Sequence, residues 1–184
     1  MRGKYKNDYT TKVLFMNSLK EIMMQQQKSY NKVGVQELCE HIGLNRKTFY
    51  YHFNNINELM NWTIEEIYKE VKEKGNLKDP LSTFSIIIDA TEQNKDFFKC
   101  MEPEQLKELL SNYFKTLIEQ AFIKNQESSQ KKINPSYLEF LSSFYSFGIA
   151  GSLYDFIFTK KYYSSRELLL HYERLSSTNL KSIL

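Results

Sequence analysis

Apolar residues recur at helical spacing along most of the chain, and polar stretches separate these segments. Helices are predicted over residues 10–27, 35–42, 46–52, 55–74, 80–93, 103–123, 135–159 and 165–177. A short helix or turn is expected around Phe97 and Phe98, and loops are expected over residues 28–34 and 124–134. The pattern therefore predicts an all-α fold.

Several of these boundaries carry residues that start or end helices. Side-chain oxygens suited to cap a helix start occur at Thr10 or Thr11, Asn45, Asn55, Asp79, Asn134 and Ser164. Glu58 and Glu167 each follow a cap by three residues, as in a capping box. Gly43 follows the helix over 35–42, where a left-handed residue ends many helices. The first nine residues are polar and basic, and we expect a poorly ordered arm.

Composition and charge sharpen this picture. Only six Gly and three Pro occur in 184 residues, which argues against a turn-rich β fold. Residues 1–62 hold nine Lys and Arg against five Asp and Glu, whereas the rest holds sixteen against seventeen. The positive charge thus lies in the N-terminal third, as expected if that third contacts a polyanion. A mildly basic solvated surface explains the charge alone equally well.

Residues 35–52 have the pattern of a helix-turn-helix, with two short helices joined by a turn that contains Gly43. Leu44 is the apolar residue of the turn, and Phe49 points inward from the second helix. The second helix also carries a run of long polar and aromatic side chains: Arg46, Lys47, Thr48, Tyr50, Tyr51 and His52. Such a helix predicts binding in the major groove of DNA.

The residue types suggest separate roles on this helix. Arg46 and Lys47 lie in its first turn and can donate to guanine O6 and N7. Thr48 and Tyr51 suit thymine methyl groups or phosphates, and Tyr50 and His52 suit the DNA backbone. The predicted DNA-binding residues are Gln36, Asn45, Arg46, Lys47, Thr48, Tyr50, Tyr51 and His52. Packing of Tyr50 or Tyr51 between helices is the alternative.

The segment TFYYHF at 48–53, followed by Glu58-Leu59, resembles the DNA-binding domain of the TetR family of transcription regulators over about residues 10–60. The longer segment NRKTFYYHF is also similar to a sub-group that includes activators of dihydroxyacetone kinase operons in Gram-positive bacteria. The resemblance implies a helix-turn-helix DNA-binding domain over residues 1–54 and an effector-binding and dimerisation domain over 55–184.

Two positions depart from the family pattern. Ile56 stands where the family usually has a Lys that contacts a phosphate, so one backbone contact is missing. The free amides at that helix start can still bind a phosphate. Lys47 stands where a small residue is usual, which we expect to alter base preference.

The helix predicted over 135–159 is apolar on nearly all sides, which indicates burial against more than one neighbour. One side can pack in the core of its own chain and another against a second subunit, as the resemblance also implies, because the family dimerises through its last two helices. The predicted dimer interface comprises Gly148, Gly151, Ser152, Phe156, Leu168, Tyr172 and Leu175. A central helix inside a monomer is the alternative.

By resemblance, a small-molecule effector is expected to bind among the helices that follow residue 54. The predicted lining residues are Trp62, Glu66, Phe84, Ile88, Tyr113, Phe114, Phe144 and Tyr145. Each of them suits a place in the core at least as well, since aromatic residues at helical spacing commonly fill cores.

Other chemistry finds little support. No nucleophile elbow, phosphate loop or zinc helix signature occurs, so we expect no enzyme activity, no cofactor and no metal. Cys39 and His41 lie about 200° apart around one helix. Cys39 and Cys100 form no spacing motif, and in a cytosolic chain both are expected to be thiols packed as small residues. No segment is apolar enough to span a bilayer and no signal peptide is visible, so a cytoplasmic protein is expected.

The sequence thus predicts a dimeric TetR-type regulator that binds a double-stranded DNA operator under the control of an unknown small molecule. Its two recognition helices are expected to contact half-sites about one helical turn, ~34 Å, apart. The alternative is a helical module that regulates through a protein partner, which the missing Lys at Ile56 favours.

Overall fold

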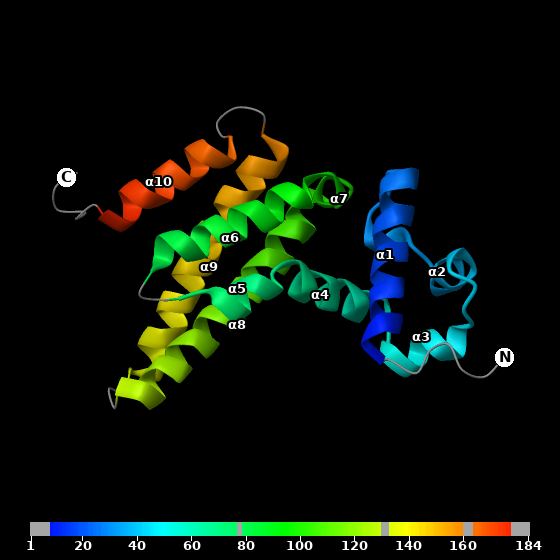
Figure 1. Cartoon of the computed structure of the whole chain (residues 1–184), viewed down its shortest axis with the longest axis horizontal. Coiled ribbons are helices and arrows are strands. Elements are labelled where there is room, and N and C mark those ends of the chain that lie inside the picture. Colours follow the sequence, from blue (N-terminus) through cyan, green and yellow to red (C-terminus); the bar gives the residue numbers. More distant parts are fainter. Residues whose placement is uncertain (1–7, 77–78, 130–132, 160–163, 178–184) are drawn as a thin grey trace. The chain divides into compact units, whose positions relative to one another are not determined.

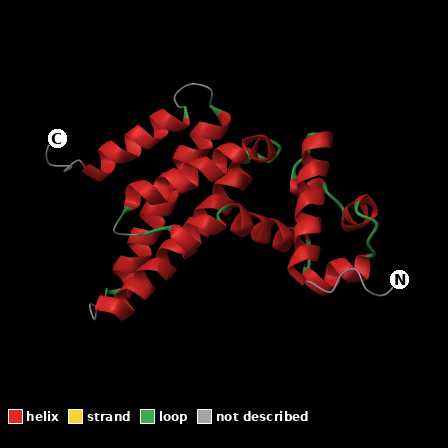
Figure 2. Ribbon diagram, viewed as in Figure 1, coloured by secondary structure: helices red, strands yellow, loops and turns green. Residues whose placement is uncertain are grey.

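The structure, a computed structural model, describes residues 8–76, 79–129, 133–159 and 164–177. These residues form ten α-helices, one 3-10 helix and no strand, apart from a single bridge between Asn76 and Asp79 (Figure 1, Figure 2). The predicted all-α fold is confirmed.

Two compact units make up the chain. One unit, here the N-terminal unit, contains residues 1–66 and 96–102. The other, here the C-terminal unit, contains residues 67–95 and 103–184. The predicted domain boundary between residues 54 and 55 stays a prediction.

The N-terminal unit is built on four helices and a short 3-10 turn. Their bounds are α1 Asp8–Gln26, the 3-10 turn Tyr30–Lys32, α2 Val35–His41, α3 Arg46–His52 and α4 Ile56–Ile67. Its fully buried side chains come from these helices and from α7 (Lys95–Lys99), and they include Phe15, Leu19, Leu38, Phe49, Leu59, Phe97 and Phe98. The rings of Phe15 and Phe49 meet edge to face at 5.3 Å, so aromatic packing joins α1 to α3.

The start of α1 differs from the prediction. A cap at Thr10 or Thr11 was expected to begin the helix, but α1 already begins at Asp8. Asp8 lies one turn before Lys12, and their charged groups are 3.8 Å apart, which favours a helical first turn. Thr11 is only 1% exposed, so it packs inside the unit.

The C-terminal unit contains the long helices. Their bounds are α5 Lys69–Lys74, α6 Pro80–Gln93, α8 Pro103–Ser129, α9 Pro135–Phe158 and α10 Ser165–Ser177. Helices α8 and α9 pack along one another, and α6 packs against α5 and α10 (Figure 1). The buried residues of this unit include Tyr68, Ile87, Ile88, Leu106, Leu110, Phe114, Leu153, Ile157 and Leu168.

Five predicted caps in the chain are confirmed as side chains that accept backbone N–H groups, and four of them match the prediction fully. Asn45 accepts from Thr48 at 2.9 Å, and Asp79 accepts from Ser82 at 3.1 Å. The other two are Asn134 before α9 and Ser164 before α10, the latter with its Glu167 partner. At α4, Asn55 caps Glu58 as expected, but Glu58 accepts from the backbone N–H of Asn54 rather than of Asn55.

The helix predicted over 55–74 is interrupted at Tyr68, whose backbone has φ −101° and ψ 19°. Tyr68 is fully buried, and its hydroxyl lies 2.8 Å from the Thr91 hydroxyl. Its carbonyl accepts a hydrogen bond from the Tyr113 hydroxyl at 3.2 Å. Tertiary contacts therefore fix the break.

The loop predicted over 124–134 is partly wrong, because α8 continues as a helix to Ser129. Residues 130–132 lie outside the described part of the chain. Among the described residues, no helix has the length and apolar character needed to cross a membrane.

Candidate nucleic-acid interface

The turn between α2 and α3 is fixed by backbone hydrogen bonds. Gly43 has φ +66°, a left-handed conformation that glycine adopts without steric cost. The Leu44 N–H donates to the Cys39 carbonyl at 2.9 Å, and the Gly43 N–H donates to the Glu40 carbonyl at 3.3 Å. These two bonds form a Schellman motif, which satisfies the free carbonyls at the end of α2 and sets the direction of α3.

Helix α3 separates a buried face from an exposed one. Phe49 is fully buried, whereas Tyr50 is 49% and Tyr51 is 79% exposed. At the start of the helix, the Asn45 side chain accepts from both the backbone N–H and the hydroxyl of Thr48. The cap and the buried Phe49 together fix the position of α3, from which the exposed side chains project.

Most predicted DNA-binding residues lie on the surface of the N-terminal unit. Gln36, Asn45, Arg46, Lys47, Tyr50 and Tyr51 are exposed, and Thr48 and His52 are half-buried. Arg46 Nη2 lies 3.5 Å from the Tyr50 hydroxyl, and Gln36 donates to Glu40 at 2.8 Å. The structure brings Lys47, Thr48, Tyr51 and His52 of α3 around one hollow and pairs Arg46 with Tyr50 apart from it, but the contacts of all these residues with DNA stay predictions.

An open hollow of about 450 Å³ adjoins the exposed face of α3. It lies between the first turns of α1 and the whole length of α3, and it is lined by Asp8, Thr11, Asn45, Lys47, Thr48, Tyr51 and His52. The His52 side chain is only 5% exposed. Lys47, predicted to contact bases, and Thr48 and Tyr51, predicted to contact thymine methyl groups or phosphates, therefore line the same hollow as a nearly buried imidazole.

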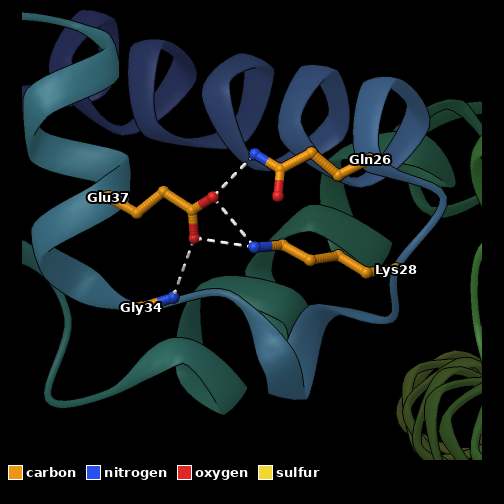
Figure 3. Close-up of polar contacts among 4 residues, drawn as sticks. All are labelled: Gln26, Lys28, Gly34 and Glu37. Carbon is orange, nitrogen blue, oxygen red and sulfur yellow. Dashed lines mark hydrogen bonds and ion pairs between the residues drawn. The ribbon is translucent and has the colours of Figure 1, made fainter.

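Glu37 is a residue that the sequence analysis missed. Its carboxylate accepts two hydrogen bonds of 2.8 Å from Lys28 and one of 2.8 Å from Gln26 (Figure 3). It also accepts the backbone N–H of Gly34, which precedes α2, at 3.4 Å. The hydrogen bonds from Lys28 hold the pKa of Glu37 below its ordinary value. This network joins the end of α1 to the start of α2.

A second polar contact joins the same two helices. His41 Nδ1 lies 3.1 Å from the hydroxyl of Ser18, and His41 Nε2 lies 3.7 Å from the Glu21 carboxylate. Ser18 is 1% exposed, so its hydroxyl is inaccessible as a nucleophile. The contacts of His41 with Ser18 and Glu21 instead hold α2 against α1. Burial raises the pKa of the Cys39 thiol, which therefore stays protonated as a packed residue.

The predicted effector-binding residues lie in both units and differ in how far they are buried. In the N-terminal unit, Tyr9 packs its ring edge against Trp62 and donates to Glu66 at 2.6 Å. In the C-terminal unit, Phe84 stacks on Tyr172 at 4.1 Å. The remaining residues differ in exposure: Ile88 and Phe114 are buried, Tyr113 is half-buried, and Phe144 and Tyr145 are exposed. Tyr113 and Phe114 both contact the ring of the buried Tyr68.

The predicted dimer residues also fall into two groups. Phe156, Leu168 and Tyr172 are buried within the C-terminal unit. The others are exposed or half-buried, namely Gly148, Gly151, Ser152 and Leu175. The hydroxyls of Ser152 and Tyr172 are hydrogen-bonded, which ties α9 to α10.

Helix α9 leaves a row of aromatic side chains exposed. The members of this aromatic face, each 47–63% exposed, are Tyr137, Phe140, Phe144, Tyr145 and Phe147. The rings of Phe140 and Phe144 stack on each other at 6.1 Å. Such a run of exposed aromatic residues is typical of a surface that meets a partner.

Comparison with known proteins places this helix-turn-helix among regulators. A model described as "Bacterial regulatory proteins, tetR family" matches residues 22–61, and a TetR model described as "Transcriptional regulator C-terminal region" matches residues 78–177. A search of curated proteins gave no match. Within the described residues, no group of three or more His, Cys, Asp or Glu comes together as a metal site.

Two solved structures are similar in fold. The dihydroxyacetone kinase operon activator DhaS is 15% identical, with a TM-score of 0.57 over 90% of this chain and 92% of its own. A transcriptional regulator (TerR/AcrR family) from Aquifex aeolicus VF5 is 21% identical, with a TM-score of 0.50 over 95% of this chain and 99% of its own. At these identities the similarity supports the fold alone, so the predicted sub-group stays a prediction.

Proposed function

The chain belongs to the TetR family of transcription regulators, and we propose that it binds a specific DNA operator as a homodimer in the cytoplasm. In this proposal α3 enters the major groove, and a small molecule bound in the C-terminal unit controls operator affinity. The proposal requires that the effector bind one conformation more tightly than the other, because only differential affinity shifts an equilibrium.

The exposed face of α3 carries the proposal. Lys47 and Tyr51 project from a helix whose other face is anchored by the fully buried Phe49 and whose start is capped by Asn45. Such anchoring keeps the helix backbone in one orientation as DNA approaches. Base contacts by one basic and one aromatic side chain then supply sequence preference, while backbone contacts supply general affinity.

Binding to a duplex from the protein's own promoter region tests the proposal. We expect specific, salt-sensitive binding, and Lys47→Ala and Tyr51→Ala each weaken it by about 1–3 kcal/mol. Fluorescence anisotropy measures the affinities, with Lys72→Ala as a control that removes an exposed lysine of α5. Unchanged affinity in both α3 variants would contradict the assignment of this face.

The homodimer is supported by the exposed aromatic face of α9. Gly148 and Gly151 lie on the same helix, and a Cβ built at either glycine meets nothing within 4 Å in the single chain. Their small size therefore has no role in the packing of their own unit. Two copies of α9 can approach closely at these glycines and cover the aromatic residues.

Small-molecule control is supported by polar groups inside the apolar C-terminal unit. Tyr68, Thr91 and Tyr113 form a hydrogen-bonded set at its centre, beside the ring of Phe114. Ligand sites in proteins commonly combine apolar walls with a few polar groups of this kind. A thermal-shift screen tests this part, because a ligand that binds the folded state raises its melting temperature.

A helical module that acts through a protein partner is the second candidate. It is favoured by Ile56, which places an apolar side chain at the start of α4 where the resemblance leads us to expect a phosphate-binding lysine. Specific binding to the promoter duplex by the purified chain alone would exclude this candidate. Absence of DNA binding until a protein partner is added would favour it.

A further inference from the structure

The hollow beside α3 contains an acidic residue where a DNA-binding surface is expected to be basic. Among the described residues that line it, Asp8 alone carries a carboxylate, and Lys47 alone carries an amine. Asp8 belongs to the first turn of α1, and its carboxylate also lies 3.8 Å from the amine of Lys12. One carboxylate thus lies beside the amine of Lys12 and lines the same hollow as Lys47.

The Asp8 carboxylate is placed directly at the imidazole of His52. Oδ1 of Asp8 lies 2.9 Å from Nδ1 of His52, and the His52 side chain is only 5% exposed. The nitrogen nevertheless has no hydrogen-bond partner among the described residues. The Tyr51 ring stands edge-on to the imidazole at 4.9 Å and limits its movement. A nearly buried imidazole nitrogen therefore lies beside the hollow with a carboxylate close to it but without a hydrogen bond.

The remaining lining groups suit an oxyanion. The amine of Lys47, the hydroxyl of Tyr51 and the side-chain amide of Asn45 all offer donors of the kind that hold DNA phosphates. The protein's own carboxylate stands among these donors. Free protein and a bound phosphate would thus place negative charge in the same hollow.

We propose that this hollow takes one backbone phosphate of bound DNA, and that Asp8 competes with that phosphate. The inference rests on the proposed DNA-binding function and adds a residue that sets the overall affinity for DNA. Every duplex carries the same phosphates, so the Asp8 charge lowers affinity for all sequences alike. The contacts of α3 with bases then have to offset the affinity that the Asp8 charge removes. Only an operator has the bases that allow these contacts. Asp8 thereby lowers the occupancy of unrelated DNA, while the ratio of operator to non-operator affinity is unchanged.

The test is Asp8→Asn, which keeps the shape of the side chain and removes its charge. Anisotropy is measured with the promoter duplex and with a scrambled duplex of equal length, at several salt concentrations. We expect both duplexes to bind roughly five- to tenfold more tightly at about 0.1 M salt, and log K against log salt to steepen by about 0.9, as for one more neutralised phosphate. The ratio of the two affinities stays the same.

Glu21→Gln is the matched control. Glu21 also pairs with a histidine, His41, in the same unit, but neither residue lines the hollow. We expect no change in affinity or salt slope from this substitution. Equal changes in both variants would mean that Asp8 acts only through net charge, and this would overturn the proposal.

The wild-type chain provides a second measurement. The ring NMR signals of His52 are expected to shift on addition of the scrambled duplex, while those of His41 stay in place. Unshifted His52 signals, or weaker binding by a folded Asp8→Asn variant, would overturn the phosphate site. If the wild-type chain binds neither duplex, the proposed function itself fails, so the two failures are distinguishable.

Discussion

At the scale of single residues, Glu37 illustrates what spacing along the chain does not reveal. Its partners are Gln26 at the end of α1 and Lys28 in the loop that follows, and the hydrogen bonds exist only once α1 and α2 have packed. The polar character of residues 28–34 predicted a loop correctly in most positions, but gave no sign of this network. Tertiary contacts of this kind decide the orientation of α2 and follow from the fold rather than from local sequence.

Replacing Glu37 by Gln removes the charge of the network. Because the Lys28 amine and the Glu37 side chain are partly exposed, water weakens their attraction, and the expected loss of unfolding free energy at pH 7 is about 0.5–1 kcal/mol. The folded-state pKa of Glu37 is lowered, so its contribution is complete above the ordinary pKa of about 4.3 and is lost as the pH falls through the folded-state value.

Urea unfolding at pH 7 and pH 3 measures this difference. The difference in unfolding free energy between wild type and Glu37→Gln is expected to be smaller at pH 3 than at pH 7. Glu65→Gln, which changes an exposed glutamate of α4, provides the control and is expected to leave stability unchanged. A gap that stays constant across the two pH values would show that charge is not what Glu37 contributes.

Gly43 is the residue on which the turn depends most. Gly43→Ala places a Cβ on a backbone with φ +66°, which costs about 1–2 kcal/mol of unfolding free energy, although the Cβ itself meets nothing within 4 Å. Gly34→Ala is the matched control, since Gly34 has φ −88° and equally open surroundings. Chemical denaturation compares the two, and equal effects would show that the left-handed conformation is unimportant.

At the scale of elements, capping residues made most helix boundaries predictable. Asn45, Asp79, Asn134 and Ser164 each accept the backbone groups that a free helix start leaves open, and this chemistry is local. The break at Tyr68 was not predictable, because it depends on hydrogen bonds with Thr91 and Tyr113, which come from α6 and α8. The candidate DNA-binding face was predictable because α3 is short and its buried face is a single Phe.

The aromatic face of α9 was only partly predictable. A helix that is apolar all round indicates two neighbours, but it does not say which face meets which neighbour. The structure buries Leu153, Phe156 and Ile157 in the C-terminal unit and leaves Phe140 and Phe147 exposed. Helical spacing alone treats these residues alike, so the choice depends on how α8 and α10 pack against α9.

Replacing the glycines of α9 by leucine tests the proposed dimer interface. Gly148→Leu and Gly151→Leu each add a bulky side chain to open space, so the single chain is expected to keep or slightly gain stability from better helix propensity. Close approach of a second α9 becomes impossible, and sedimentation is expected to show monomers at concentrations where the wild type dimerises. Asn112→Leu on α8 adds the same side chain at an exposed position and is the control. A dimer that survives both glycine changes would contradict this interface.

At the scale of the whole molecule, the two units have complementary tasks in the proposed function. The N-terminal unit presents one recognition helix, whose few side chains specify only a short half-site. The C-terminal unit supplies the exposed face that joins two copies. A two-fold dimer therefore contacts two half-sites, and the symmetry of the protein requires a matching symmetry in its operator.

Hydroxyl-radical footprinting on the promoter duplex tests this central claim most directly. The wild-type dimer is expected to protect two symmetry-related patches whose centres lie about one helical turn apart, ~34 Å. At a protein concentration that only just saturates the wild-type footprint, Lys47→Ala is expected to weaken both patches together, because each half-site depends on the same α3 residue. A single patch without symmetry, or an equally strong symmetric footprint in Lys47→Ala at that concentration, would contradict the account.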